Sequence, residues 1–184
     1  MLRVPVALVF LLFYCALPFV IKKQLDWRAA IGYLLSGYVV GLFVAAVLET
    51  VITEYYSTVI SSDIQNVILG PVIEETLKFC TIMFWRNRGH TIRVITGYNV
   101  GLGLGFQETL LRIYLGAGLF PEIFPLRTIL TMPMHFSVAS ISAFSIMKRV
   151  RTNQKRYYLL ANFAVIGHII FNVVAQRVAF IFQN

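Results

Sequence analysis

The sequence is organised as a series of apolar runs that are long enough to cross a lipid bilayer as helices. A spanning helix needs about 20 mostly apolar residues, and six runs of roughly that length follow one another along the chain. They cover roughly residues 4–21, 29–48, 67–85, 92–115, 128–147 and 157–180. The short connections favour antiparallel neighbours. The sequence therefore predicts an all-α protein, a polytopic membrane helical bundle of about six transmembrane helices.

The composition excludes the common soluble classes of protein. Hydrophobic residues make up 58% of the chain and charged residues 13%, whereas ordinary soluble domains carry about 25% charged residues. This excludes a disordered chain, a basic nucleic-acid-binding domain and an ordinary cytosolic enzyme. We expect a single integral-membrane domain over residues 1–184, in contact with the lipid bilayer and with no nucleic acid. Cys15 and Cys80 lie in apolar runs and are expected to be free thiols in the core.

The basic residues, which give the chain a net charge of +8, cluster between the apolar runs. In the antiparallel arrangement, one side of the membrane collects Lys22, Lys23, Arg28, Arg86, Arg88, Arg93, Lys148, Arg149, Arg151, Lys155 and Arg156. The other side collects Arg3, Arg112, Arg127 and Arg177. Loops rich in Lys and Arg stay in the cytoplasm. We therefore expect an integral protein of the cell membrane with both termini extracytoplasmic.

Several ionisable side chains lie inside the apolar runs, where each costs free energy unless it faces the interior of the bundle. They are Glu74, Glu75, Lys78, Glu108, His135 and His168. Glu74 and Glu75 precede Lys78 by four and three residues, so either carboxylate can contact the lysine on one helix. His168 and Asn172 also share a helix face. At about 1.5 Å per residue, four helices carry these groups to a similar depth, in the outer half of the membrane or near its midplane.

Small residues recur at the spacing that lets membrane helices approach closely. G-x-x-x-G patterns are formed by Gly37, Gly41, Gly97, Gly101 and Gly105. The last three glycines lie on the predicted fourth helix, the one that carries Glu108. We therefore expect this helix to pack in the interior of the bundle.

Four segments carry a family resemblance. Residues 70–78, Gly-Pro-Val-Ile-Glu-Glu-Thr-Leu-Lys, contain the pattern E-E-x-x-K, and residues 101–109 form a glycine-rich segment that ends in Glu108 and Thr109. Residues 133–135 read P-x-H, and residues 167–172 contain H-x-x-x-N. In this order the segments resemble the motifs of PrsW-type intramembrane proteases, within the wider superfamily of CAAX proteases and bacteriocin-processing enzymes. The motif-bearing core covers about residues 67–180.

The resemblance implies a helical-bundle protease that cuts a membrane-tethered protein within or near the membrane. The catalytic residues that it implies are Glu74, Glu75, Glu108, His135, His168 and Asn172, with Lys78 in support. The two adjacent glutamates would activate water, and Glu108 takes the position of the second motif. His168 and Asn172 would stabilise the oxyanion, with His135 assisting. In PrsW-type families the cut lies on the outer side of the membrane, which agrees with the expected depth.

The residues themselves suit this chemistry. Amide hydrolysis needs a base for water, an acid for the leaving amine and donors for the oxyanion. A lysine beside two carboxylates can neutralise one and leave the other to exchange a proton, and imidazole and amide groups can donate to the oxyanion. Together with the family resemblance, these residues predict an intramembrane endopeptidase that uses glutamate-activated water.

Other interpretations use the same residues. Two glutamates and two histidines can bind zinc, but the H-E-x-x-H spacing is absent, so a metal is disfavoured and we expect no cofactor. The Glu–Lys cluster can also be a self-neutralised ion pair that holds helices together. At the level of function, the alternatives are a non-catalytic membrane scaffold and a proton-coupled transporter or channel.

Overall fold

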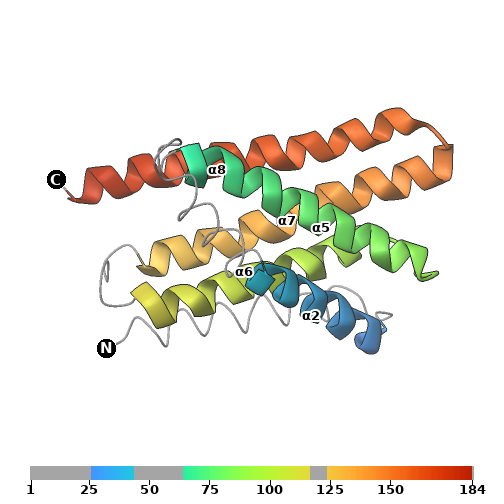
Figure 1. Cartoon of the computed structure of the whole chain (residues 1–184), viewed down its shortest axis with the longest axis horizontal. Helices are drawn as coiled ribbons and strands as arrows, with labels where there is room; N and C mark the ends of the chain where they lie inside the picture. The colour runs from blue at the N-terminus through green and yellow to red at the C-terminus, as the bar shows by residue number, and fades with distance from the viewer. Residues whose placement is uncertain (1–25, 44–63, 117–123, 184) are drawn as a thin grey trace.

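The computed structural model describes residues 26–43, 64–116 and 124–183 of the chain (Figure 1). Within these ranges every regular element is helical. The α-helices are α2 (Trp27–Phe43), α5 (Gly70–Asn87), α6 (Val94–Gly116), α7 (Phe124–Thr152) and α8 (Ala161–Gln183). A π-helical turn, η2 (Gln65–Leu69), leads into α5, and a 3-10 helix, η3 (Lys155–Leu160), leads into α8.

The helices coincide with five of the six predicted apolar runs, which confirms the all-α prediction for the described part of the chain. The run over residues 4–21 lies outside the described residues, so the number of six transmembrane helices stays a prediction. The boundaries differ most at α7, which extends from Phe124 to Thr152 instead of covering residues 128–147. Lys and Arg are good helix formers, so the loss of hydropathy there does not end the helix.

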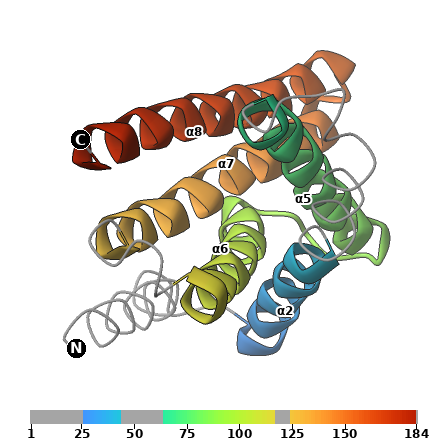
Figure 2. The same cartoon turned by 60° about the vertical axis from the view of Figure 1, so that its left-hand side comes forward.

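Helix α6 lies between α2 and α7 (Figure 2) and packs along both. Glycines make this close approach possible. A Cβ atom at Gly101 would collide with the backbone of His135 on α7, and one at Gly103 would collide with the carbonyl group of Leu34 on α2. The prediction that the glycine-rich helix is interior is therefore confirmed, and the glycines fix how deeply α7 and its His135 sit against α6.

Helix α5 crosses the bundle obliquely and contacts α2, α6, α7 and α8 (Figures 1 and 2). Pro71 lies in its first turn, where a backbone N–H has no partner within the helix in any case. Because α5 touches each of the other described α-helices, side chains from its first turns can reach groups on α6, α7 and α8.

Helix α8 packs against α7 and leaves an apolar stripe uncovered in the described structure. With the preceding turn it exposes Leu159, Phe163, Ile166, Ile170 and Val173, which recur at helical spacing. Two helical stretches of the described residues, Leu130–Thr152 and Lys155–Arg177, are long and apolar enough to cross a membrane. An apolar stripe of this kind suits contact with lipid.

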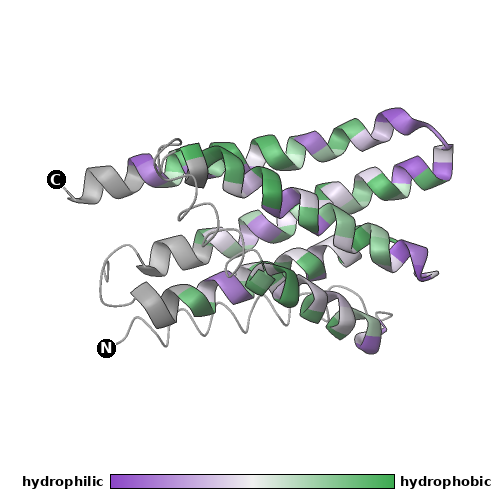
Figure 3. Ribbon diagram, viewed as in Figure 1, coloured by the Kyte–Doolittle hydropathy of each residue, from purple (hydrophilic) through white to green (hydrophobic). Residues whose placement is uncertain are grey.

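Polar residues gather in two places along these apolar helices (Figure 3). One is the middle of the bundle. The other is the end of the bundle where α5 and α7 finish and η3 begins (right in Figure 3).

Cys80 is a free thiol, as predicted, but it is exposed, so the expectation of a core position is wrong. The surface of a membrane helix bundle is as apolar as its interior, and an apolar run therefore does not reveal which of its faces is buried. Cys15 lies outside the described residues.

Candidate active site

Four helices bring ionisable side chains together in the middle of the bundle. The group, here called the central cluster, consists of Glu74, Glu75 and Lys78 on α5, Glu108 on α6, His135 on α7 and His168 on α8. The side chains of Lys78 and His135 are fully buried, and Glu75 and His168 are nearly so. Glu74 and Glu108 keep 20% and 23% of their side-chain surface exposed, so they form the accessible edge of the cluster.

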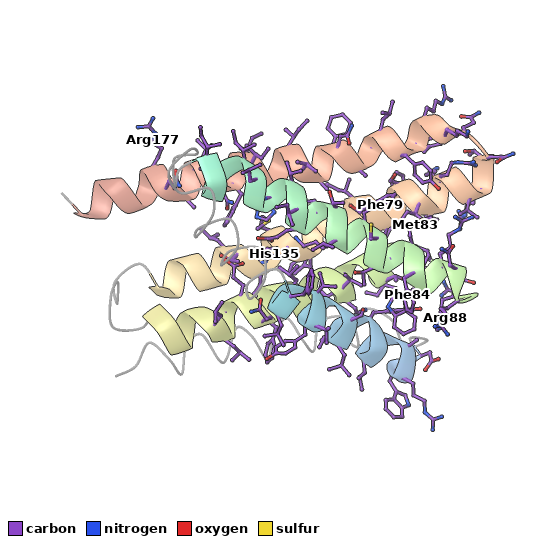
Figure 4. All side chains as sticks on the ribbon, viewed as in Figure 1. Phe79, Met83, Phe84, Arg88, His135 and Arg177 are labelled. Atoms are coloured by element: carbon purple, nitrogen blue, oxygen red, sulfur yellow. The ribbon has the colours of Figure 1, made fainter. Side chains whose placement is uncertain are left out.

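Lys78 joins α5 to α7. Its Nζ atom lies 2.5 Å from Oε1 of Glu75 and 2.8 Å from Nδ1 of His135. An ammonium group only donates hydrogen bonds, so Nδ1 of His135 accepts and the imidazole proton is assigned to Nε2. That Nε2–H donates to Oε2 of Glu108 over 2.5 Å. The result is a hydrogen-bonded chain from Glu75 to Glu108 that runs through α5, α7 and α6 (His135 is labelled in Figure 4).

His168 reaches the same carboxylate from α8. Its Nδ1 atom lies 2.8 Å from Oε1 of Glu75, which also accepts from Lys78. Because a carboxylate accepts, the proton of His168 is assigned to Nδ1, and Nε2 then carries a lone pair. The rings of His135 and His168 are nearly perpendicular, with centroids 5.3 Å apart. Glu75 therefore holds both Lys78 and His168 in position.

Glu74 lies too far from Lys78 and His168 for the direct hydrogen bonds that Glu75 makes, although Oε2 of each glutamate is buried without a hydrogen-bond partner in the described structure. Oε2 of Glu74 lies 3.8 Å from Nδ1 of His135, 3.9 Å from Nζ of Lys78 and 4.0 Å from Nδ1 of His168. These separations exceed a direct hydrogen bond, but a water molecule can bridge groups at such distances. Glu74 therefore has an oxygen free to bind a water molecule beside three nitrogen-bearing groups.

The structure brings together all of the predicted ionisable residues. Asn172 lies one turn beyond His168 on α8 and is partly buried. What the sequence did not reveal is the pairing: Glu75 with His168 across 93 residues, and Lys78 with His135 across 57 residues.

A second group was treated only as loop charge in the sequence. Arg86, Arg93 and Arg151 line one cavity at the end of the bundle where α5 and α7 finish. The only signal in the sequence was that the runs of basic residues containing them fall on the same predicted side of the membrane.

Four members of the central cluster could hold a metal ion by residue type. Ligand atoms of Glu74, Glu75, His135 and His168 lie within 4.8 Å of one another. The hydrogen bonds, however, do not fit a metal ion. Lys78 takes the lone pair of Nδ1 of His135 and one oxygen of Glu75, while Nδ1 of His168 is turned toward that same oxygen. A metal ion bound through Nδ1 of His135 and Oε1 of Glu75 would need the lone pairs that Lys78 uses, so the cation of the chain itself competes with a metal at these two atoms.

Comparison with known families decides the assignment. The sequence model of the PrsW family of intramembrane metalloproteases matches residues 26–183, a range that contains the whole central cluster and Asn172. The chain belongs to the PrsW family. Comparisons with curated proteins and with solved structures gave no match.

Membership of the PrsW family makes the chain a membrane protein and an intramembrane peptide hydrolase, whose substrate is a protein in the membrane. The resemblance seen in the four sequence motifs is thereby confirmed. Placement in the wider superfamily of CAAX proteases stays a prediction. The description of the PrsW family as metalloproteases points to a metal, whereas the hydrogen bonds of Lys78 do not fit one.

Proposed function

We propose that the protein hydrolyses a peptide bond of a membrane-tethered protein with a water molecule that Glu74 activates. The observation that carries this proposal is the buried, unpartnered Oε2 atom of Glu74, within 4.0 Å of nitrogens on Lys78, His135 and His168. Glu75 lies beside Glu74 in the sequence; its Oε1 atom accepts from both Lys78 and His168, and its Oε2 atom is also buried without a hydrogen-bond partner in the described structure. The side chain of Glu74 is 20% exposed and that of Glu75 1%. This difference in access supports Glu74 as the base, and the hydrogen bonds of Glu75 support it as the residue that positions Lys78 and His168.

In the proposed reaction the Glu74 carboxylate accepts a proton from water while the water oxygen bonds to the peptide carbonyl carbon. The carbonyl oxygen becomes an oxyanion. Glu74 then gives its proton to the amide nitrogen, the C–N bond breaks, and a carboxyl group and an amine leave. The same carboxylate serves first as base and then as acid, as general acid–base catalysis allows.

The remaining residues of the site stabilise the oxyanion and orient the catalytic side chains. Lys78 has three N–H donors, of which two bind Glu75 and His135, so the third is left for the water or the oxyanion. Asn172 donates through its amide to the oxyanion. His168 donates from Nε2 when doubly protonated, with Glu75 balancing the charge. Glu108 fixes the orientation of His135 through its Nε2–H.

The proposed reaction uses no metal ion, because Lys78 occupies the position of the cation among the four possible ligands. A fixed ammonium can stabilise developing negative charge without reorganisation.

The test is cleavage of a panel of single-pass membrane proteins co-expressed with the wild type, Glu74→Gln or Glu75→Gln. Asp26→Asn is the matched control, because it removes a carboxylate charge at the basic end of the bundle, away from the central cluster. Glu74→Gln is expected to lower cleavage by at least about a hundredfold at unchanged abundance, and Asp26→Asn to leave it unchanged.

The outcomes separate the alternatives. Full cleavage by Glu74→Gln would overturn the role of Glu74. Loss of cleavage by the purified wild type in a zinc chelator, with recovery on adding zinc, would overturn the metal-free reaction. If the wild type cleaves none of the panel and every variant retains its function in the host, the protein is a non-catalytic scaffold and the proposed protease activity is wrong.

We further propose that the site opens to the extracytoplasmic side of the cell membrane. Glu74 lies in the first turns of α5, far from its basic end, and basic ends stay in the cytoplasm. The test is labelling by a membrane-impermeant maleimide, in a cysteine-free background, of Arg177→Cys and of Arg88→Cys, which lie at opposite ends (Figure 4). Labelling of Arg177→Cys alone in intact cells is expected, and labelling of Arg88→Cys alone would reverse the orientation.

A further inference from the structure

A cavity of about 720 Å³ lies at the basic end of the bundle. It is lined by the end of α5, the connection from α5 to α6, the first residues of α6, and the last turns of α7. It is here called the basic cavity. Its polar lining residues are Arg86, His90, Thr91, Arg93 and Arg151. Three arginines that are up to 65 positions apart in the sequence therefore face one space.

These arginines are not neutralised within the described structure. Among the described residues no carboxylate lies within ion-pair distance of Arg86, Arg93 or Arg151. The described carboxylates are Asp26, Glu74, Glu75 and Glu108, and the three glutamates belong to the central cluster. At the basic end this leaves Asp26, whose Oδ1 accepts the backbone N–H of Arg28 at 3.0 Å. Like charges around one cavity repel one another, so an anion between them is favoured.

Neighbouring arginines at the same end are engaged with the protein itself. The guanidinium of Arg88 lies over the ring of Phe84 at 5.1 Å, and that of Arg156 over the ring of Tyr157 at 5.6 Å. Arg149 donates to the side chain of Asn153 over 2.6 Å. The arginines of the basic cavity have no such contact in the described structure, which separates them from the general charge of this end.

The rest of the lining suits a phosphate group. Helix α6 begins at Val94, and Val94 and Ile95 line the cavity; the first N–H groups of a helix have no partner within it and attract anions. Thr91 adds a hydroxyl group. His90 is held at the wall, because its Nδ1 shares a hydrogen bond of 3.1 Å with the hydroxyl of Tyr33 and its ring packs edge-on against Trp85.

The apolar lining indicates where the phosphate comes from. Val94, Met147 and Val150 also line the cavity, and Val94 and Val150 are about half exposed at the surface of the bundle. A free phosphate ion gains nothing from contact with apolar side chains. A phospholipid can place its headgroup among the arginines and its acyl chains along the apolar side chains. Basic pockets between membrane helices on the cytoplasmic side bind anionic lipid headgroups.

We propose that the basic cavity binds the phosphate group of an anionic phospholipid. The site is separate from the central cluster, and the proposal does not depend on the proposed function.

The test is binding of phosphatidylglycerol to the purified full chain in neutral detergent, measured by native mass spectrometry and by the thermal midpoint. Phosphatidylcholine and inorganic phosphate are the comparison ligands. The triple variant Arg86→Gln, Arg93→Gln, Arg151→Gln removes the cavity charge. The matched control is Arg28→Gln, Arg88→Gln, Arg156→Gln, which removes the same charge from exposed residues outside the cavity.

The expected result is binding of phosphatidylglycerol, with binding roughly a hundredfold weaker in the cavity triple variant and changed less than about threefold in the control triple variant. Equal weakening in both triple variants would overturn the proposal in favour of unspecific attraction to a basic surface. Inorganic phosphate that raises the midpoint as much as phosphatidylglycerol does would overturn the lipid as its source. If the cavity triple variant does not fold, Arg93→Gln compared with Arg88→Gln gives the same ranking.

Discussion

The central cluster and the basic cavity both collect charged side chains from several helices, but their charges are balanced in opposite ways. In the central cluster three glutamates face one lysine and two histidines. Hydrogen bonds of 2.5 to 2.8 Å hold Glu75 and Glu108, whereas Oε2 of Glu74 lies 3.8 to 4.0 Å from the three nitrogens. In the basic cavity three arginines line one space, and no carboxylate of the described residues pairs with them.

The difference follows from the surroundings. The central cluster is buried in apolar helices, where an unpaired charge costs several kcal/mol, so each of its carboxylates lies within 4.0 Å of a nitrogen-bearing side chain. The basic cavity opens at the end of the bundle, where water and lipid headgroups supply the opposite charge. We therefore expect single substitutions to be costly in the central cluster and mild at the basic end.

The largest effect is expected from Lys78→Met, which breaks the balance of the central cluster. Glu75 then stays buried without its cation, and breaking a buried pair costs about 3–5 kcal/mol. Unfolding in detergent measures this loss. The double variant Glu75→Gln, Lys78→Met removes both charges and is expected to recover most of the stability. A double variant whose loss is the sum of the two single losses would show that the pair is not coupled.

A smaller loss of stability is expected from Gly101→Ala, which tests the close packing of α6 against the backbone of α7 at His135. Its new Cβ would collide with the backbone of His135, and overpacking of this kind costs about 1–3 kcal/mol. Because His135 must move, cleavage is expected to fall at least about tenfold. The control is Gly167→Ala, whose Cβ would meet its nearest neighbour, Val138, at an ordinary 3.7 Å and is expected to leave cleavage and stability intact. Equal behaviour of the two variants would contradict the tight packing of α6 on α7.

Glu108→Gln is expected to have a milder effect than Lys78→Met. The amide oxygen of Gln still accepts from Nε2–H of His135, so only the charge on the acceptor is lost, a difference of about 1 kcal/mol. Cleavage is expected to fall about tenfold, clearly less than in Glu74→Gln, and Glu108→Ala, which removes the acceptor, is expected to fall further. A loss in Glu108→Gln as large as that in Glu74→Gln would make Glu108 a direct participant.

The smallest effect is expected from Arg88→Gln at the basic end. Arg88 is exposed, and its guanidinium lies over the ring of Phe84; surface substitutions of this kind change stability little. The thermal midpoint and the cleavage rate are expected to stay at the wild-type values. A marked loss of either would mean that the basic end is as tightly balanced as the central cluster, and the contrast between the two regions would disappear.

Much of the fold was predictable because hydropathy and small-residue spacing are local properties. The apolar runs gave α2, α5, α6, α7 and α8 in order, and the glycines of α6 indicated that it is interior. The end of α7 was not predictable in this way, because Lys148 to Arg151 continue the helix beyond the apolar run. Nor was the exposure of Cys80, because lipid-facing and core-facing positions are equally apolar.

The sequence by itself determined which residues do not suit a lipid-facing position. Ionisable residues such as Glu74, Glu75 and Lys78 cost free energy in an apolar helix unless they face the interior of the bundle. The order of these residues along the chain also revealed the family motifs. Only the tertiary structure decided which of them pair. Glu75 forms hydrogen bonds with Lys78 and His168, Glu108 forms one with His135, and Oε2 of Glu74 has no hydrogen-bond partner among the described residues. Likewise, only the packing of α5, α6 and α7 turned Arg86, Arg93 and Arg151 into one cavity. Such pairings depend on the rotation and depth of each helix against its neighbours, which close packing at the glycines sets and which no local pattern encodes.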